Sequence, residues 1–93
     1  MIILSLTYKA DIAQADVHMQ PHMEWVRQGY ERGWFLASGR KVPRTGGVII
    51  AKGDRAEIEA FVALDPFVIH AIADYDITEV AMTTVTDGVA ALA

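Results

Sequence analysis

The stretch WFLASGRKVPRTGGVIIA, residues 34–51, decides the fold. Its two ends, Trp34–Ala37 and Val48–Ala51, are apolar, and the segment between them, SGRKVPRTGG, is rich in turn-forming residues. Two short apolar runs joined by such a segment are typical of a β-hairpin. We therefore predict two short strands at the centre of the chain, joined by a long basic loop over residues 38–47.

A helix is predicted on the N-terminal side of this hairpin. Apolar residues recur at spacings of 4, 3 and 4 from Met19 to Tyr30, which places them on one face of an amphipathic helix. Pro21 falls either in the first turn of this helix or at a kink within it. Gly33 is a plausible stop, because glycine is favoured just past a helix end.

A second helix is predicted on the C-terminal side. Asp54 is followed three residues later by Glu57, an aspartate variant of the capping box that begins many helices. Its buried face is expected to consist of Ile58, Phe61 and Val62. The sequence Asp65-Pro66-Phe67 then ends it and opens a short helical turn.

Two outer strands complete the pattern. Ile2–Tyr8 is rich in β-branched and aromatic residues and reads as the first strand, and residues 77–85 read as the last. Residues 9–16 form a connection or a first helical turn, and residues 86–93 form a tail. The order βαββαβ predicts an α+β, ferredoxin-like fold: a four-stranded antiparallel sheet with two helices on one face. Residues 1–93 are expected to form one domain.

Composition limits the partners of this domain. The chain is 53% hydrophobic with a mean hydropathy of +0.25, yet it has no apolar run of the roughly 18 residues that a membrane span needs. Surplus apolar surface on the free face of the sheet is best covered by a second copy of the chain, so we expect a homodimer, or a larger homo-oligomer, built as a dimeric α+β barrel.

Charge, cysteine content and the N-terminal sequence limit the ligands, the chemistry and the cellular location that we expect for this protein. The net charge of −4 argues against nucleic-acid binding, which needs a basic face. The absence of cysteine excludes disulfides, a thiolate zinc site and a thiol nucleophile. The start, MIILSL, has no basic lead-in and is expected to be a strand and not a signal peptide, so a cytoplasmic location is expected.

The most site-like residues are His22 and Asp65. An imidazole can take or give a proton near neutral pH, and a carboxylate facing it would fix its tautomer and stabilise the imidazolium. Two simpler interpretations stay open: His22 as a half-buried histidine satisfied by a neighbour, and Asp65 as a helix N-cap only. One carboxylate can do both jobs, because a cap uses only one of its oxygens.

The loop of the hairpin is a candidate ligand-binding segment. Ser38 offers a hydroxyl and Gly39 a closely approachable backbone, while Arg40 and Arg44 make this part of an acidic chain locally basic. These residues would suit a carboxylate, phosphate or phenolate ligand, although an ordinary solvated loop has the same composition. No strand–elbow–helix pattern surrounds Ser38, so we do not expect it to be a nucleophile.

Two other groups are weaker candidates. His18 lies four residues before His22 and the two could share a helix face, but no third ligand is evident, so we expect neither a metal nor a cofactor. A set of aromatic side chains could line a pocket, although such residues more often belong to a core or a dimer contact: Tyr8, Trp25, Trp34, Phe67 and Tyr75.

The ordered set of short motifs resembles the YCII-related (YciI-like) family over residues 1–85. The set consists of Gln20-Pro21-His22 opening a helix, Gly33 before a strand ending in Ser38-Gly39, Gly46-Gly47 opening the next strand, and Asp65-Pro66-Phe67.

This resemblance implies a fold similar to that of muconolactone isomerase, with dimeric α+β barrels, and an active-site pair at His22 and Asp65. It also implies a pocket lined by Ser38 and Gly39. The family often has arginine two residues before the histidine, where this chain has Gln20, so no anion contact from the helix is expected. Most members have no assigned reaction, and dehydrohalogenase-like chemistry is known within the family.

Three functions fit these observations. The first is a cofactor-free lyase or isomerase acting on a small anionic cyclic or aromatic compound, with His22 moving the proton, Asp65 orienting it, and Ser38 with the Gly39 backbone holding an oxyanion. The second is a non-catalytic small-molecule binder that uses the same pocket. The third is a structural dimer-forming module that assists another protein.

Overall fold

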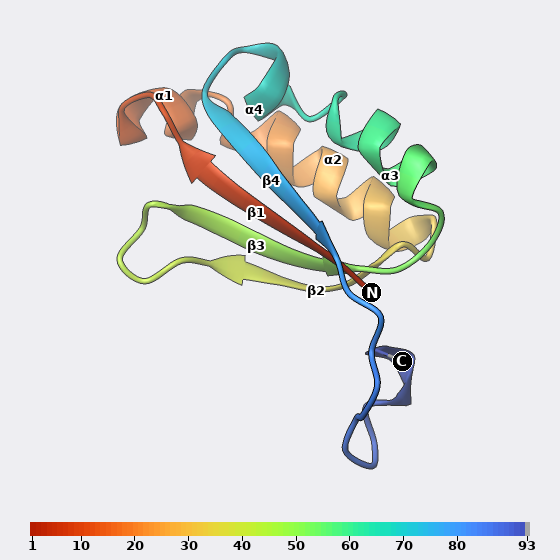
Figure 1. The fold of residues 1–93 in the computed structure, drawn as a ribbon. Coiled ribbons are helices and arrows are strands. Elements are labelled where there is room, and N and C mark those ends of the chain that lie inside the picture. Colours follow the sequence, from red (N-terminus) through yellow and green to blue (C-terminus); the bar gives the residue numbers. More distant parts are fainter. Residues whose placement is uncertain (93) are drawn as a thin grey trace.

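A four-stranded antiparallel sheet forms one layer of the protein, and the helices gather on one of its sides (Figure 1). The computed structural model describes residues 1–92. Its elements, in chain order, are β1 (Ile2–Tyr8), α1 (Ile12–Val17), α2 (Met19–Glu31), β2 (Phe35–Arg40), β3 (Gly46–Ala51), α3 (Arg55–Val62), α4 (Pro66–Ile69), β4 (Ala73–Glu79) and η1 (Ala90–Leu92). The predicted α+β, ferredoxin-like fold is confirmed.

The strands lie in the order β2-β3-β1-β4, so β1 is central and pairs with both β3 and β4. Side chains alternate between the two faces of β1: Ile2, Leu4 and Leu6 are buried toward the helices, whereas Ile3 and Ser5 face the opposite, uncovered side. One face of the sheet therefore carries the core and the other is open.

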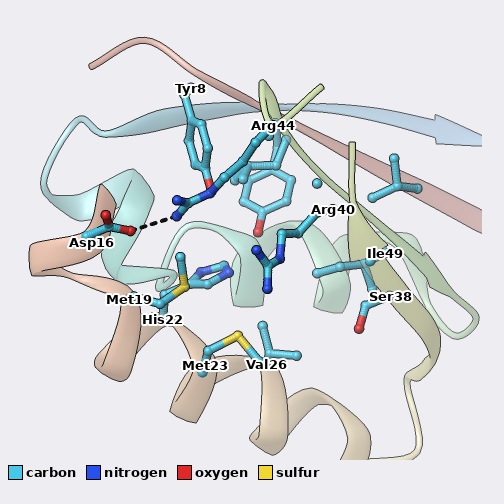
Figure 2. Close-up of a pocket in the computed structure, with 16 residues that line it drawn as sticks. Tyr8, Asp16, Met19, His22, Met23, Val26, Ser38, Arg40, Arg44 and Ile49 are labelled. Atoms are coloured by element: carbon cyan, nitrogen blue, oxygen red, sulfur yellow. Dashed lines mark hydrogen bonds and ion pairs between the residues drawn. The ribbon is translucent and has the colours of Figure 1, made fainter. Parts of the chain in front are cut away.

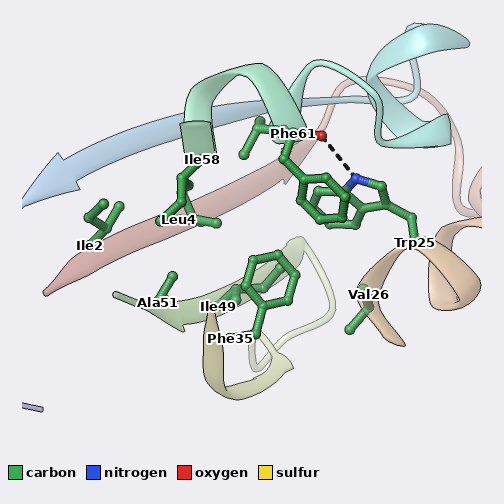
Figure 3. Packing of buried hydrophobic residues seen from close by; sticks show 10 residues of the cluster. Ile2, Leu4, Trp25, Val26, Phe35, Ile49, Ala51, Ile58 and Phe61 are labelled. Atoms are coloured by element: carbon green, nitrogen blue, oxygen red, sulfur yellow. Dashed lines mark hydrogen bonds between the residues drawn. The ribbon is translucent and has the colours of Figure 1, made fainter. Parts of the chain in front are cut away.

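The main core lies between the sheet and the two longer helices (Figure 3). Trp25 of α2 stacks on Phe61 of α3, with ring centroids 4.8 Å apart, and its indole N–H donates a 2.9 Å hydrogen bond to the Phe61 carbonyl. Phe35 of β2 packs edge-on against Trp25. These contacts fix α2, the helix that carries His22, relative to α3 and the chain that follows it.

The predicted helix boundaries agree with the structure where the sequence contains a recognisable capping residue. The Asp54 side chain accepts a 3.0 Å hydrogen bond from the Glu57 N–H at the start of α3. Gly33 follows α2 with a φ of +76°, a left-handed conformation that favours glycine. Pro21 is the third residue of α2 and so lies in its first turn, one of the two predicted positions.

The hairpin is confirmed, but the predicted long loop over residues 38–47 is wrong. Residues 38–40 belong to β2, where Ser38 pairs with Ile49 and Arg40 with Gly47. Only residues 41–45 form the loop. The glycines of this segment suggested a loop, but glycine is also found in edge strands and where another backbone approaches closely. Gly46 is such a position, because a Cβ atom there would run into the Leu6 carbonyl of β1.

The predicted last strand is present, but its predicted bounds, residues 77–85, are wrong. β4 begins at Ala73, opposite Tyr8, and ends at Glu79, opposite Ile2. Beyond Glu79 the strand has no partner left to pair with except Met1, whose carbonyl accepts from the Val80 N–H. The chain then leaves the body of the domain (Figure 1). The predicted tail, residues 86–93, carries the short η1, and residue 93 lies outside the described residues.

Candidate active site

His22 and Asp65 touch. The His22 Nδ1 atom lies 2.8 Å from Asp65 Oδ1, although the two residues are 43 positions apart in the chain. Asp65 is fully buried and His22 is about nine-tenths buried. The structure thus brings together the two residues that the sequence singled out.

Asp65 is held by the start of α4. Its Oδ1 atom accepts a 2.9 Å hydrogen bond from the Phe67 N–H, which makes it the N-cap of α4, with Pro66 at the first helical position. The same oxygen meets His22, and Oδ2 accepts a 2.6 Å hydrogen bond from the Tyr75 hydroxyl. The carboxylate is therefore both a cap and the partner of the imidazole.

Tyr75 is the site residue whose role the sequence analysis missed. Burial raises the pKa of the Tyr75 phenol well above its usual value, and the adjacent negative charge of Asp65 raises it further. Tyr75 is therefore a fixed hydrogen-bond donor to Asp65. The predicted start of the last strand at residue 77 hid this role; with β4 beginning at Ala73, alternation turns Ala73, Tyr75 and Ile77 toward the helices.

The orientation of the imidazole leaves one nitrogen free. The His22 ring stacks on the Phe67 ring, with centroids 4.0 Å apart and planes 4° from parallel. With Nδ1–H donated to the Asp65 carboxylate, Nε2 carries the lone pair. Nε2 has no hydrogen-bond partner within residues 1–92. Among these residues, Arg44 Nε is the one side-chain polar atom that is both buried and without a partner. Since His22 Nε2 has no partner either, it must be reached by solvent.

His22 opens onto a cavity of about 580 Å³ between α2 and the β2–β3 hairpin (Figure 2). This volume falls within the range of small-molecule sites. Much of the wall is apolar, from Leu6, Met19, Met23, Val26 and Ile49. The predicted substrate-binding residues also line it: Ser38, Gly39, Arg40 and Arg44.

The two arginines of the cavity differ in their partners. Arg44 Nη2 donates a 2.7 Å hydrogen bond to Asp16 Oδ1 of α1. The Arg40 side chain is directed into the cavity (Figure 2) and has no acidic partner in the described part of the chain. The site thus presents one uncompensated cation to a ligand.

Ser38 and Gly39 contribute unequally. The Ser38 hydroxyl lies 2.8 Å from the Tyr30 hydroxyl, which orients it. The Lys41 N–H donates to the Gly46 carbonyl, and this pattern repeats at every second residue of an antiparallel ladder, so the Gly39 N–H is directed at Val48 within the sheet. The hydroxyl of Ser38 is accordingly more available to a ligand than the Gly39 N–H.

The predicted aromatic set divides between the cavity and the core. Tyr8 and Tyr75 line the cavity. Trp25 and Phe67 are core residues, and Trp34 packs against the main core at a distance from this cavity. Two of these five aromatic residues therefore line the cavity.

The two histidines considered as a metal pair are engaged elsewhere. The His18 ring stacks on His70 at the end of α4, with centroids 4.1 Å apart, and His22 is bonded to Asp65. Within residues 1–92, no group of three His, Asp or Glu side chains is placed to hold a metal ion.

Comparisons with known proteins identify the family. The family model described as the YCII-related domain matches residues 1–81, which is most of the chain. A search of curated proteins found no match. No helix in the described residues is long and apolar enough to cross a membrane. The chain belongs to the YCII-related domain family.

Proposed function

We propose that this member of the YCII-related family is a cofactor-free lyase or isomerase that moves a proton on a small anionic cyclic or aromatic compound. The observation that carries this proposal is the buried His22–Asp65 contact at the wall of a cavity, with the second imidazole nitrogen free. Such a pair is suited to acid–base chemistry, because the carboxylate fixes the tautomer and stabilises the imidazolium that forms.

The proposed step begins with a C–H bond of the substrate next to an electron-withdrawing group. The His22 Nε2 lone pair takes the proton, the C–H bond breaks, and its electron pair moves onto a substrate oxygen. The oriented Ser38 hydroxyl and the uncompensated Arg40 are the groups available to stabilise that oxygen. An isomerase then returns the proton to another carbon, whereas a lyase expels a leaving group.

Solvent exchange tests this proposal without a known substrate. A panel of small cyclic and aromatic carboxylates would be incubated with the protein in D₂O, and incorporation of deuterium followed by proton NMR and mass spectrometry. We expect one or more compounds to exchange, and His22→Asn to lower the exchange rate by about 10²–10⁴-fold, the usual contribution of a positioned acid–base group. Asparagine keeps an N–H near the Nδ1 position for Asp65 but has no basic nitrogen.

His18→Asn is the matched control, since His18 lies four residues before His22 and stacks on His70, whereas the histidine bonded to Asp65 is His22. This variant should catalyse deuterium incorporation into the compounds of the panel at the wild-type rate. An unchanged rate in His22→Asn would contradict the proposal, and binding of a compound without exchange or conversion would favour the non-catalytic binder. A purely structural module would neither bind these compounds nor catalyse their deuterium exchange.

We further propose that a homodimer, or a larger homo-oligomer that contains it, forms through the open face of the sheet. This face carries Ile3, Val48 and Ile50 at its centre, by the pairing of β1 with β3. Lys41 directly follows β2 at one edge of this face, and Asp74 and Asp76 lie on β4 at the other edge. A two-fold axis parallel to the strands would place β2 of one copy opposite β4 of the other, so that these opposite charges face each other across the interface. A cytoplasmic location and the absence of nucleic-acid partners stay predictions from the sequence.

A further inference from the structure

An ion pair crosses the cavity between α1 and the hairpin loop. Arg44 Nη2 bonds to Asp16 Oδ1 at 2.7 Å, and both residues line the cavity (Figure 2). The Asp16 side chain is 59% exposed, whereas that of Arg44 is 29% exposed. Asp16 can therefore return to water at little cost, while Arg44 is the more enclosed member of the pair.

Asp16 satisfies only half of the donor pair that Arg44 presents. One edge of a guanidinium carries two parallel N–H groups, at Nε and at one terminal nitrogen, and a carboxylate can accept both. Asp16 takes Nη2 alone, and Arg44 Nε is buried without a hydrogen-bond partner in the described residues. An unsatisfied buried donor is costly, so an acceptor that reaches both N–H groups would bind Arg44 better than Asp16 does.

We propose that Asp16 is an internal competitor for the carboxylate of the substrate: it occupies Arg44 in the empty pocket and is displaced when a ligand carboxylate takes both N–H groups. This inference rests on the proposed function and names its substrate class, a small cyclic or aromatic carboxylate. The carboxylate binds Arg44, and the ring lies against the apolar wall formed by Met19, Met23 and Val26. Arg40 then remains for negative charge at the reacting end.

Binding of benzoate, measured by calorimetry at 0.15 M salt, tests the competition. We expect Asp16→Asn to bind benzoate about 2- to 5-fold more tightly than wild type, the size expected when one exposed ion pair no longer competes. Asp11→Asn is the matched control, because Asp11 has the same charge, adjoins α1 and makes no side-chain cap bond. At this salt, screening should leave its affinity unchanged.

Arg44→Lys keeps the charge and removes the paired N–H groups, so it should weaken benzoate binding about ten-fold, the loss expected for one charged hydrogen bond. In the Arg44→Lys background, Asp16→Asn should bring no gain, because Asp16 acts only through Arg44. Benzamide, the neutral analogue of benzoate, and inorganic phosphate should both bind more weakly than benzoate.

Several results would overturn the inference: equal effects of Asp16→Asn and Asp11→Asn, a gain from Asp16→Asn that persists with lysine at position 44, or no binding of benzoate to Asp16→Asn. Benzamide or phosphate binding as tightly as benzoate would overturn the carboxylate class. These readouts need no turnover. A protein that binds benzoate through Arg44 but exchanges no proton would contradict the proposed chemistry and leave this inference standing.

Discussion

The carboxylate of Asp65 divides its two oxygens among three donors. Oδ1 accepts from the Phe67 N–H and faces His22, and Oδ2 accepts from the Tyr75 hydroxyl. A fully buried carboxylate needs such partners, because burying a charge without them is costly. The same partners hold the carboxylate in one orientation, which is what the proposed chemistry at His22 requires.

Tyr75→Phe should reduce stability and change its dependence on alkaline pH. At neutral pH the loss of a hydrogen bond to a charged acceptor should lower the free energy of unfolding by about 1.5–3 kcal/mol. In wild type the raised pKa keeps Tyr75 protonated when folded, whereas the unfolded chain loses this proton near pH 10. Above pH 10 the unfolded state therefore binds fewer protons than the folded state.

It follows that the stabilisation from Tyr75 is complete below about pH 10 and declines above it, by up to about 1.4 kcal/mol per pH unit. Urea unfolding of wild type and Tyr75→Phe between pH 8 and 11 measures this difference, and the two curves should converge as pH rises. Tyr30→Phe is the control, because Tyr30 is an exposed tyrosine bonded to Ser38. Parallel curves for wild type and Tyr75→Phe would show that Tyr75 ionises alike in both states.

At the scale of elements, α2 is positioned by its close approach to β2. Gly29 on α2 is buried, and a Cβ atom there would run into the Phe35 ring. That ring is enclosed by Trp25, Tyr30 and Phe61, with centroids 5.4–5.9 Å away, so it has little room to move. A glycine at this point lets α2 lie close enough to the sheet for His22 to reach Asp65.

Gly29→Ala should therefore destabilise the protein, although alanine favours helices. Overpacking a core costs about 1–3 kcal/mol, and the gain in helix propensity returns at most about 1 kcal/mol. Thermal unfolding followed by circular dichroism should show a lower midpoint than wild type. Gly39→Ala is the matched control, since a Cβ at Gly39 meets nothing within 4 Å. Equal midpoints for Gly29→Ala and wild type would mean that Phe35 does not constrain the helix.

The sequence predicted the elements better than their ends, and the errors have a shared cause. The strand at the chain start and the cap at Asp54 depend on local preferences and were located correctly. β2 and β4 have bounds that depend on register with a neighbour: β4 begins opposite Tyr8 and ends opposite Ile2, which no local pattern records. Tyr75 was missed as a partner of Asp65 for that reason.

The candidate site shows the same difference between features that depend on local sequence and features that depend on packing. The cap at Asp65 was predictable from Asp65-Pro66 alone, but its contact with His22 joins elements 43 residues apart and was suggested only by the fold and the family resemblance. The Asp16–Arg44 pair also joins distant segments, and neither residue has a local pattern that predicts the other. Local chemistry is readable from sequence, whereas partners across the fold need the packed structure.

At the scale of the whole molecule, the two faces of the sheet carry different kinds of residues. The helix side holds the core and His22, and the open side carries half-buried aliphatic residues of β1 and β3. Ile50 pairs with Ile3 at the centre of the open side and does not line the cavity. A change at Ile50 should therefore affect the proposed self-association without altering the cavity.

Ile50→Lys should convert the proposed dimer to a monomer that remains folded. A two-fold interface places each substitution twice, and burying two lysine side chains should weaken association by at least about 100-fold, or about 2.7 kcal/mol. Analytical ultracentrifugation over a range of concentrations measures the mass, and circular dichroism checks the fold. Ile69→Lys on α4 is the control, because Ile69 is 61% exposed on the helix side. It should retain the wild-type mass, whereas a wild-type protein that sediments as a monomer would remove the basis for a dimer through this face.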